Sequence, residues 1–434
     1  MKLIDQYLQL FSVLSALYIF SFLLINITLR ESDRGFLLKV IGLSFILNTS
    51  TVIIVSEFLR SKFGAPFLPG IDIWKFNKIS WQMAQSDRIL GVEGLSGPAI
   101  YVLNAGIFQY FGQNPLIIRG VYVFLVCLSA IFSYKIAKDL FGKTPARYAA
   151  IFVALYPNFF IYSALPHREI LVTFFGVFTV WYFLLAIRHL KLIGFFLGSI
   201  GLLLLYWSRS ELSIIILFVI LLYLVYRRIG IDWIQKGLIV VISVSLLISL
   251  GVFIKRSGPG QERGLNLFSP AYLARELEEI KRGQRRFDSE GLGSYLLYAS
   301  YPERLIIGFP FMLIKPFPPW KTLSMFAHST FTTPGTLVWY LLMPFSFIGM
   351  VEAFRNFQKD YMVIILIPFF VLAAAALAYG AETARYRVQI MPYLLVFAGL
   401  GFSIRKKYHQ AICLYIIAFF GGVVLYLILK TLGY

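Results

Sequence analysis

The feature that constrains this chain most is a series of apolar runs, each close to the length that an α-helix needs to cross a bilayer. Crossing about 30 Å of hydrocarbon takes roughly 20 predominantly apolar residues. The chain contains twelve such runs, which predict an all-α, polytopic transmembrane helix bundle of about 12 spans. They lie near residues 9–30, 37–56, 117–141, 146–164, 170–187, 191–206, 211–227, 236–254, 336–354, 360–379, 386–404 and 408–430.

The composition also predicts an integral membrane protein. Of the 434 residues, 59% are hydrophobic and 14% are charged, and a soluble domain of this kind would expose too much apolar surface to stay dispersed. The aromatic content of 17% suits interfacial belts and grooves for sugar or lipid, as well as packing. We therefore expect a single transmembrane domain over residues 1–434.

The first apolar run predicts a retained span. It is too long for the apolar region of a secretory signal and has no convincing A-x-A cleavage site, so residues 1–30 are expected to remain in the protein. The two cysteines, Cys127 and Cys413, both fall inside predicted spans. They predict neither a disulfide framework nor a thiolate metal site.

The net charge of +19 has a topological explanation. The basic residues are scattered between apolar runs, and no soluble domain could hold a nucleic-acid duplex, so nucleic acid is not an expected partner. If the spans alternate, the basic connections fall on one side, which the positive-inside rule makes cytoplasmic. These connections carry Arg30 and Arg34, Lys143 and Arg147, Arg188 and Lys191, Arg227 and Arg228, Arg355 and Lys359, and Arg405, Lys406 and Lys407.

The opposite, extracytoplasmic side is expected to hold both termini, a first loop over 57–116, a second over 255–335, and short turns at 165–169, 207–210 and 380–385. Residues 96–112 are apolar but short, so they predict an interfacial helix. Residues 301–320 contain five prolines and are expected to dip into the interface or pack against protein. The charged stretch 274–291 predicts an exposed helix or a lid over a substrate groove.

Asp72 begins a helical pattern in "PGIDIWKFNKISWQMAQSD", residues 69–87. One interpretation is a helix cap that accepts backbone N–H bonds. The other is a carboxylate at the membrane surface that acts as a general base, its pKa set by partial burial and nearby cations. The local pattern leaves both interpretations open.

Residues 166–169, "PHRE", stand between two predicted spans. Glu169 near a helix N-terminus complements the helix dipole, which would explain it on structural grounds alone. A cation at the same place is mildly unfavourable, so we expect His167 and Arg168 to have an anionic partner.

Arg385 and Arg387 are two residues apart and would point roughly 200° apart on one helix. We therefore expect the helix to start near Arg387, with Arg385 in the preceding turn, so that both guanidinium groups can reach a phosphate. Interfacial snorkelling is the alternative. Arg209 could likewise simply pair with Glu211 or water. His189, His328 and His409 are isolated, which argues against a histidine metal site.

Taken in order, three stretches of the chain resemble the GT-C superfamily of integral membrane glycosyltransferases, particularly the dolichyl-phosphate-mannose protein mannosyltransferase and aminoarabinose transferase branch. The stretches are "DIWKFNKISWQMAQ" in the first loop, residues 99–175 from "AIYVLNAGIFQYFG" to "PHREILVTFF", and "ETARYRVQIMPYL" near the end. The resemblance covers roughly residues 60–230 and 380–400. The chain departs from the family in having Asp72 with only a distant Asp87 in place of paired acidic residues, and in lacking a soluble C-terminal domain.

The resemblance implies an inverting transferase on the extracytoplasmic face of a plasma (inner) membrane, bacterial by analogy. A polyprenyl-phosphate-linked sugar would be the donor, and a glycan, lipid or protein the acceptor, among membrane lipids. Asp72 and Glu169 match the catalytic acidic positions and could share a divalent cation, Mg²⁺ or Mn²⁺, with the phosphate. The predicted donor-phosphate residues are Arg385, Arg387, Arg168, Arg209 and Lys315. The predicted acceptor or sugar-lining residues are His167, Trp74, Tyr101, Tyr162, Glu382 and Tyr386.

Three other functions compete with this one. A polysaccharide polymerase or ligase would act on lipid-linked glycans with similar arginines. A 12-span lipid-sugar transporter should show ionisable groups at mid-span or paired broken helices, and the sequence shows neither. A non-catalytic membrane scaffold would keep its full function after Asp72→Ala.

Overall fold

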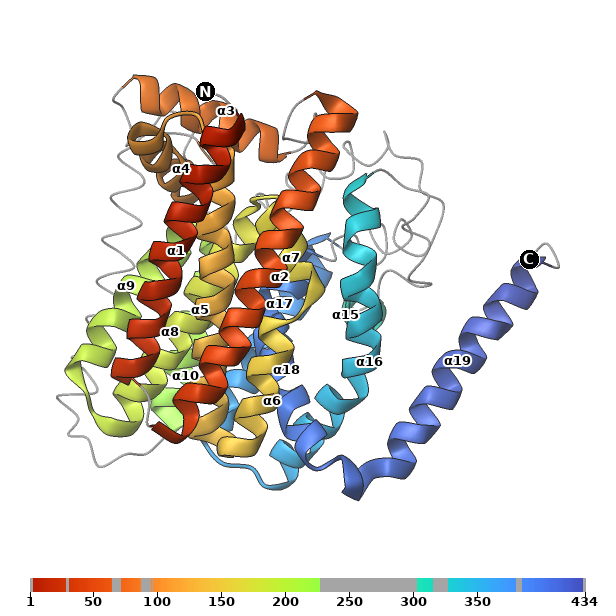
Figure 1. The fold of residues 1–434 in the computed structure, drawn as a ribbon. Helices are drawn as coiled ribbons and strands as arrows, with labels where there is room; N and C mark the ends of the chain where they lie inside the picture. The colour runs from red at the N-terminus through yellow and green to blue at the C-terminus, as the bar shows by residue number, and fades with distance from the viewer. Residues whose placement is uncertain are drawn as a thin grey trace.

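The computed structural model describes residues 3–28, 31–64, 72–86, 95, 97–226, 303–314, 327–379 and 385–431. Within these ranges the chain forms helices and no strand, which confirms the all-α prediction. Apart from α19, the helices stand together in one bundle, with α3 and α4 lying at one end of it (Figure 1). The predicted run 236–254 and the charged stretch 274–291 lie outside the described residues.

Among the described residues, five helices are long and apolar enough to cross a membrane, and six segments qualify if the bent pair α18 and α19 counts as one span. The long ones are α1 (Leu3–Thr28), α2 (Glu31–Phe63), α5 (Pro115–Phe141), α8 (Arg168–His189) and α16 (Ala327–Arg355). Shorter apolar helices are α9 (Leu192–Ser208), α10 (Ser210–Tyr226) and α17 (Tyr361–Tyr379). The chain is therefore an integral membrane protein, and the count of twelve spans stays a prediction.

The predicted run 146–164 is divided into α6 (Lys143–Ala154) and α7 (Pro157–Ala164). Tyr156 between them has an extended backbone, with φ −70° and ψ 116°. Proline has no N–H to donate and disfavours a helical residue before it, so Pro157 ends one helix and begins the next.

Helix α18 (Arg385–Ser403) is the centre of the bundle and packs against α16, α6, α8, α17 and α5. Its backbone touches that of α16, because a Cβ added to Gly349 would lie 2.0 Å from the Phe397 carbonyl oxygen, and one added to Gly401 would lie 2.0 Å from that of Phe345. Small residues permit such close helix packing in membranes. The position of α18 therefore depends on glycine at these two sites.

The bundle has two unlike ends. One, the α3–α4 end, carries α3 (Asp72–Gln85) and α4 (Pro98–Phe111). The short π-helical turn at Arg304–Gly308 and α15 (Phe309–Ile314) lie farther along the bundle, against α17 and α16 (Figure 1). At the other end of the bundle, the basic end, lie the described basic connections that the sequence predicted to share one side, whereas Arg30, Arg227 and Arg228 lie outside the described residues. Ion pairs tie them together there: Asp33 with Lys138 and Lys143, Arg188 with Asp360, and Lys407 with Glu352.

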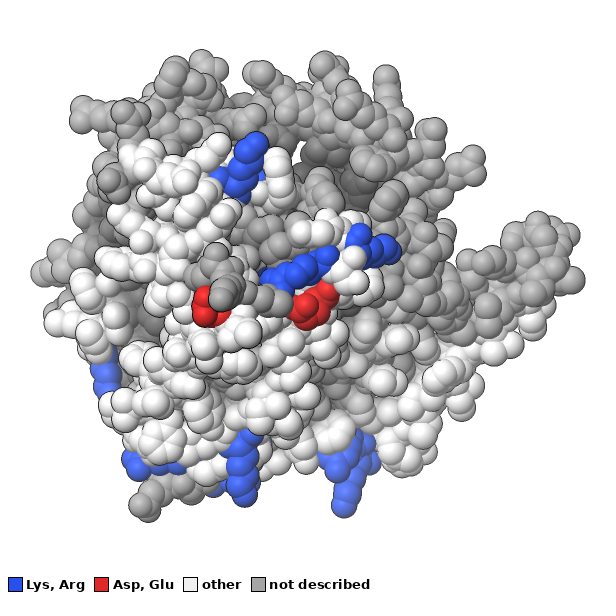
Figure 2. Space-filling model, turned by 45° about the horizontal axis from the view of Figure 1, so that its top comes forward, with Lys and Arg blue, Asp and Glu red and all other residues white. Residues whose placement is uncertain are grey.

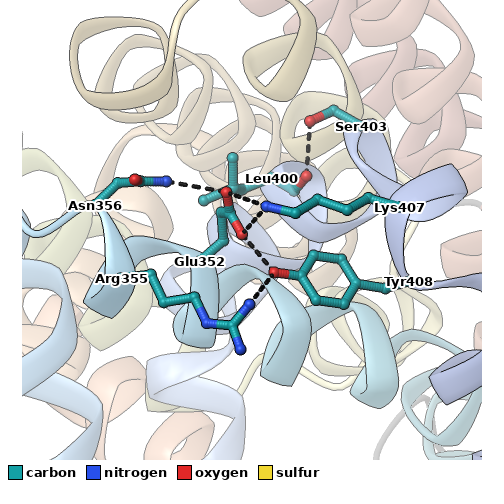
Figure 3. A network of polar contacts seen from close by, with 7 residues as sticks. All are labelled: Glu352, Arg355, Asn356, Leu400, Ser403, Lys407 and Tyr408. Carbon is teal, nitrogen blue, oxygen red and sulfur yellow. Dashed lines mark hydrogen bonds and ion pairs between the residues drawn. The ribbon is translucent and has the colours of Figure 1, made fainter.

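At the basic end the chain bends by 82° between α18 and α19 (His409–Thr431), through the short 3-10 helix Arg405–Tyr408. Glu352 of α16 accepts hydrogen bonds from Lys407 at 3.0 Å and from Tyr408 at 2.5 Å (Figure 3). Arg355 donates to the Tyr408 hydroxyl at 3.0 Å. These contacts fasten the bend to the end of α16, and α19 leaves the bundle from that point (Figure 1).

Candidate active site

Helix α3 begins at Asp72, as the sequence predicts. Its buried face carries Ile73 and Phe76, whereas Trp74 is 47% exposed and lies under the Lys78 ammonium, 4.8 Å from the ring centre. This division explains why α3 lies across the end of the bundle instead of entering it. The side chain of Asp72 is outside the described part of the structure, so its role as cap or base stays a prediction.

Helix α4 packs against α3. Its bounds agree with the short helix that the sequence predicts over 96–112. Gly97 precedes it with φ 72°, a left-handed conformation that glycine adopts readily. The ring of Tyr101 meets Phe76 edge-on with centroids 5.3 Å apart, and Phe108 meets Trp81 at 5.7 Å. Tyr101 is only 2% exposed, so it lies within this contact.

The segment "PHRE" forms a buried polar pair beneath α3. Helix α8 begins at Arg168, and His167 before it is extended, which directs the His167 ring toward Glu169. The Nδ1 atom of His167 contacts the Glu169 carboxylate, and the two residues are 0% and 1% exposed. A carboxylate buried this deeply needs a hydrogen-bonded or charged partner, and His167 is one.

Aromatic rings enclose this pair. Phe76 of α3 and Tyr162 of α7 meet the His167 ring edge-on, with centroids 6.1 Å and 5.8 Å away. The predicted residues His167, Tyr162, Tyr101 and Glu169 are therefore brought together, and Phe76 joins them to α3. Asp72 lies one helical turn before Phe76, so the helix that it starts reaches this pair.

Arg168 and Arg209 lie in the same corner of the molecule. A Cβ added to Gly97 would be 3.6 Å from Arg168 Nη1 and 3.0 Å from the Ser208 carbonyl oxygen, so the starts of α4 and α8 meet the end of α9. Arg209 is 8% exposed, with its Nε atom 3.9 Å from a Glu211 carboxylate oxygen. The expected pairing of Arg209 with Glu211 is thus present, at the outer limit of an ion pair.

Arg387 is buried and binds a backbone carbonyl. Its Nη1 atom donates to the Leu313 oxygen at 3.0 Å, and Trp339 Nε1 donates to the same oxygen at 2.7 Å. The Tyr340 hydroxyl donates to the Ile314 oxygen. These side chains satisfy the last carbonyls of α15, which a helix end leaves without intrahelical partners. The described part of 301–320 therefore packs against protein, one of the two alternatives predicted for it.

The prediction that Arg385 lies in the turn before the helix is wrong, because α18 starts at Arg385. Helical geometry then separates Arg385 and Arg387 by roughly 200° around the axis. Arg387 lies on the side of α15 and α16, where its observed contact is with Leu313. A helix that starts at Arg385 therefore does not favour the binding of one phosphate by both arginine side chains.

Helices α8 and α18 run in the same direction with matched register. Thr173 donates to the Val388 carbonyl oxygen at 3.5 Å, and a Cβ on Gly176 would lie 3.2 Å from the Tyr393 hydroxyl. Glu169 and Arg385 therefore lie at the starts of two neighbouring parallel helices. Helix α3, which Asp72 starts, reaches the same region through the Phe76–His167 contact, and the side chain of Arg385 is not described.

The remaining predicted residues cannot be located as side chains. Lys315 and Glu382 lie outside the described residues, and Tyr386 is described only as part of the α18 backbone. Seen from the α3–α4 end, the described surface is mostly uncharged, with scattered basic and acidic groups (Figure 2). The His167–Glu169 pair, by contrast, is buried.

A metal site is not complete among the described residues. They contain no group of three or more His, Cys, Asp or Glu residues that could hold an ion. His167 and Glu169 supply two candidate ligands that already contact each other. The donor set described therefore does not by itself fit a divalent cation.

Three polar residues that the sequence interpretation missed also lie here: Asn77, Ser80 and Asn104, all buried. A signal for two of them was present in "DIWKFNKISWQMAQ", where Asn77 and Ser80 share the helix face of Ile73 and Phe76. Polar residues on an otherwise apolar face mark positions that packing alone does not explain.

Comparison with known proteins agrees with this architecture. The profile of the dolichyl-phosphate-mannose-protein mannosyltransferase family matches residues 96–254, less than half of the chain. Two solved structures of the Archaeoglobus fulgidus oligosaccharyltransferase are similar, each with a TM-score of 0.55 and 15% sequence identity. In one, AglB is in complex with an inhibitory peptide and a dolichol-phosphate, and the match covers 89% of this chain and 52% of that protein. The other contains Zn and sulfate, with 87% and 51% covered.

ArnT from Cupriavidus metallidurans, bound to undecaprenyl phosphate, matches with a TM-score of 0.54 and 15% identity, over 88% of this chain and 63% of that one. The chain thus spans between 51% and 63% of the length of these solved proteins. A sequence comparison with curated proteins gives no significant match. The chain nevertheless shares the helix-bundle fold of these solved membrane proteins.

Proposed function

We propose that this protein is a membrane glycosyltransferase that moves a sugar from a polyprenyl-phosphate donor to a hydroxyl of a glycan, lipid or protein. The observation that carries the proposal is the buried His167–Glu169 pair beneath α3, at the end of the bundle where Asp72 and Arg385 begin their helices. The fold and the family profile support the same chemistry. AglB and ArnT were solved with polyprenyl phosphates, and we extend that donor class to this chain as part of the proposal.

In the proposed mechanism, Asp72 removes the proton from the acceptor hydroxyl as its oxygen attacks the anomeric carbon. The bond from that carbon to the phosphate oxygen breaks on the opposite face, so the configuration inverts. The polyprenyl phosphate leaves with the electron pair. Its developing charge needs stabilisation more than it needs a proton, and guanidinium and ammonium groups provide it. We propose Arg385, Arg168, Arg209 and Lys315 for that role.

Glu169 and Arg387 act differently in this proposal. Glu169 holds His167 and places a negative charge where helices α3, α8 and α18 meet, which orients the cations around the donor. Arg387 keeps the last turn of α15 on the bundle through Leu313, and Lys315 follows directly after that turn. His167, Tyr101 and Tyr162 line the site, with Trp74, Glu382 and Tyr386 on the side of the acceptor.

We place the reaction on the extracytoplasmic face of a bacterial inner membrane, because the basic connections gather at the end opposite to α3 and α4. No step is assigned to a metal ion. Mg²⁺ or Mn²⁺ enters the mechanism only if the Asp72 carboxylate joins Glu169 and the donor phosphate as ligands.

The test is incorporation of labelled sugar from a panel of polyprenyl-phosphate sugars by the purified protein in lipid nanodiscs. Asp72→Asn should lower turnover about 100-fold or more, since general-base catalysis contributes at least that much. Arg385→Ala should lower it as well, and Glu352→Gln at the basic end is the matched control. Equal turnover in the wild type, Asp72→Asn and Arg385→Ala would remove the site assignment.

The product of the same assay distinguishes the proposed transferase from a polysaccharide polymerase or ligase. A transferase that uses a sugar-phosphate lipid adds single residues, whereas a polymerase lengthens its product by whole repeat units. Chain-length analysis of the labelled product decides between them.

A further inference from the structure

Helices α3 and α4 bury polar side chains against each other without giving them hydrogen-bond partners. Asn104 and Ser80 are 0% exposed and Asn77 is 4% exposed. Within the described part of the chain, both amide atoms of Asn104, the Ser80 hydroxyl and the Asn77 carbonyl oxygen have no partner. The Asn77 amide nitrogen donates only to the Ile73 carbonyl of its own helix, at 2.8 Å. We name these three residues the α3–α4 polar set.

The polar set lies between two aromatic contacts that join the helices. Phe76 meets Tyr101 on one side of it, and Trp81 meets Phe108 on the other. On α4, Asn104 shares a face with Tyr101 and Phe108, three residues after the first and four before the second. On α3, Asn77 and Ser80 fall between Phe76 and Trp81. All three side chains therefore belong to the surfaces on which the two helices meet.

Buried amides elsewhere in the described chain differ: Asn158 Oδ1 and both amide atoms of Gln389 also lack a partner, whereas Asn48 is fully bonded. Asn48 is 0% exposed, donates to the Ser44 carbonyl at 2.9 Å and accepts from the Ser163 hydroxyl at 3.1 Å. That is the usual condition of a buried amide, because a lost partner leaves the desolvation penalty uncompensated. The polar set departs from it at four atoms on two neighbouring helices beside the proposed reaction site, where a partner from outside the chain could satisfy them.

We infer that the α3–α4 polar set binds the hydroxyl groups of a glycosyl ring during transfer; this rests on the proposed function. Carboxamides and a hydroxyl both donate and accept hydrogen bonds, as sugar hydroxyls do. None of the three carries the positive charge that a phosphate favours. The set shares α3 with Asp72, and Phe76 of the same helix touches His167, so a ring held here lies beside the proposed reaction site.

The test is Asn104→Leu, which keeps the size of the side chain and removes its hydrogen-bonding atoms. Its kcat/KM should fall at least tenfold, while inhibition by bare undecaprenyl phosphate should stay unchanged. A raised KM for the polyprenyl-phosphate sugar assigns the site to the donor ring. A raised KM for the acceptor glycan assigns it to the acceptor ring.

Thermal unfolding gives an independent readout. The Tm of Asn104→Leu should be unchanged or raised, because the amide has no partner to lose. Asn48→Leu, the matched control, should lower the Tm. Ser80→Ala, the smallest change to the set, should lower kcat/KM in the same assay and covers the case in which Asn104→Leu does not fold.

Kinetics equal to wild type in Asn104→Leu and Ser80→Ala would overturn the inference and leave the proposed function intact. A Tm loss like that of Asn48→Leu with unchanged kinetics would also overturn it, by showing a structural, water-bonded role. No turnover by the wild type with any donor would contradict the proposed function, and the glycosyl site with it.

Discussion

The polar groups around Glu352 at the basic end and those beneath and within α3 and α4 differ in how they are bonded. At the basic end, Glu352 accepts hydrogen bonds from Lys407, Tyr408 and Asn356, and the charges are satisfied within the protein (Figure 3). At the α3–α4 end, the His167–Glu169 pair is fully buried and the α3–α4 polar set lacks partners within the described chain. Groups that satisfy one another hold a fold together, whereas unsatisfied groups are typical of sites that await a ligand.

The same contrast extends to the other charges. Asp33 lies 2.6 Å from Lys138 and 3.3 Å from Lys143, and Arg188 lies 2.9 Å from Asp360. These pairs join α2 to α5 and α6, and α8 to the turn before α17, at the basic end. Losing any one of these ion pairs should lower the stability of the protein only slightly, because a partly exposed ion pair contributes little by itself. Substitutions at the α3–α4 end should instead change stability little and lower turnover strongly.

The largest effect should come from exchanging a carboxylate for an amide at the α3–α4 end. Glu169→Gln keeps the shape beside His167 and removes the charge, and we expect turnover to fall about 100-fold, because a small misplacement of reacting groups can cost this much. Sugar incorporation measures the loss, and circular dichroism confirms the fold. Wild-type turnover in this variant would show that Glu169 has a structural role only, like the charged residues of the basic end.

Arg387→Ala should give an intermediate effect and sharpen the comparison, because Arg387 is a buried cation whose observed partner is a backbone carbonyl. Losing the charged hydrogen bond to Leu313 should lower the free energy of unfolding by about 2 kcal/mol. Turnover should fall roughly tenfold as the end of α15 loosens, and Arg387→Lys should restore part of both.

A different result for Arg387→Ala would contradict the structural role proposed for Arg387. An unchanged Tm together with a raised KM for the donor would show that Arg387 binds the phosphate directly, as the sequence predicts. Thermal unfolding and donor kinetics on the same preparations distinguish the two roles, with Trp339→Phe as the control that removes the other donor to Leu313.

The smallest effect should come from Glu352→Gln at the basic end. Because Glu352 is partly accessible and retains neighbours that can bond an amide, the free energy of unfolding should fall by about 1 kcal/mol or less. Turnover should stay within about twofold of wild type, because the proposed site lies at the other end of the bundle. A large loss of turnover would show that the bend before α19 is coupled to the site.

Much of the candidate site could be predicted from local pattern. The helix that starts at Asp72 and the short helix over 96–112 are both present, since capping residues, Pro98 and apolar periodicity act over a few residues. The start of α18 was misplaced by two residues because it was inferred from a presumed ligand and not from a helix signal. Chain-local chemistry gave no sign of the Leu313 contact of Arg387, which joins residues 74 positions apart.

The sequence by itself determined that this chain is a membrane-embedded helix bundle, because apolar length and the distribution of charge are local properties that bilayer thickness selects. It also determined that Glu169 follows directly on a histidine and an arginine at the head of a helix. Only the tertiary structure decided that Phe76 covers His167, that Arg387 turns to α15, and that α4 packs on α3 through Tyr101 and Phe108. Those pairings depend on how distant helices pack, and no spacing along the chain encodes them.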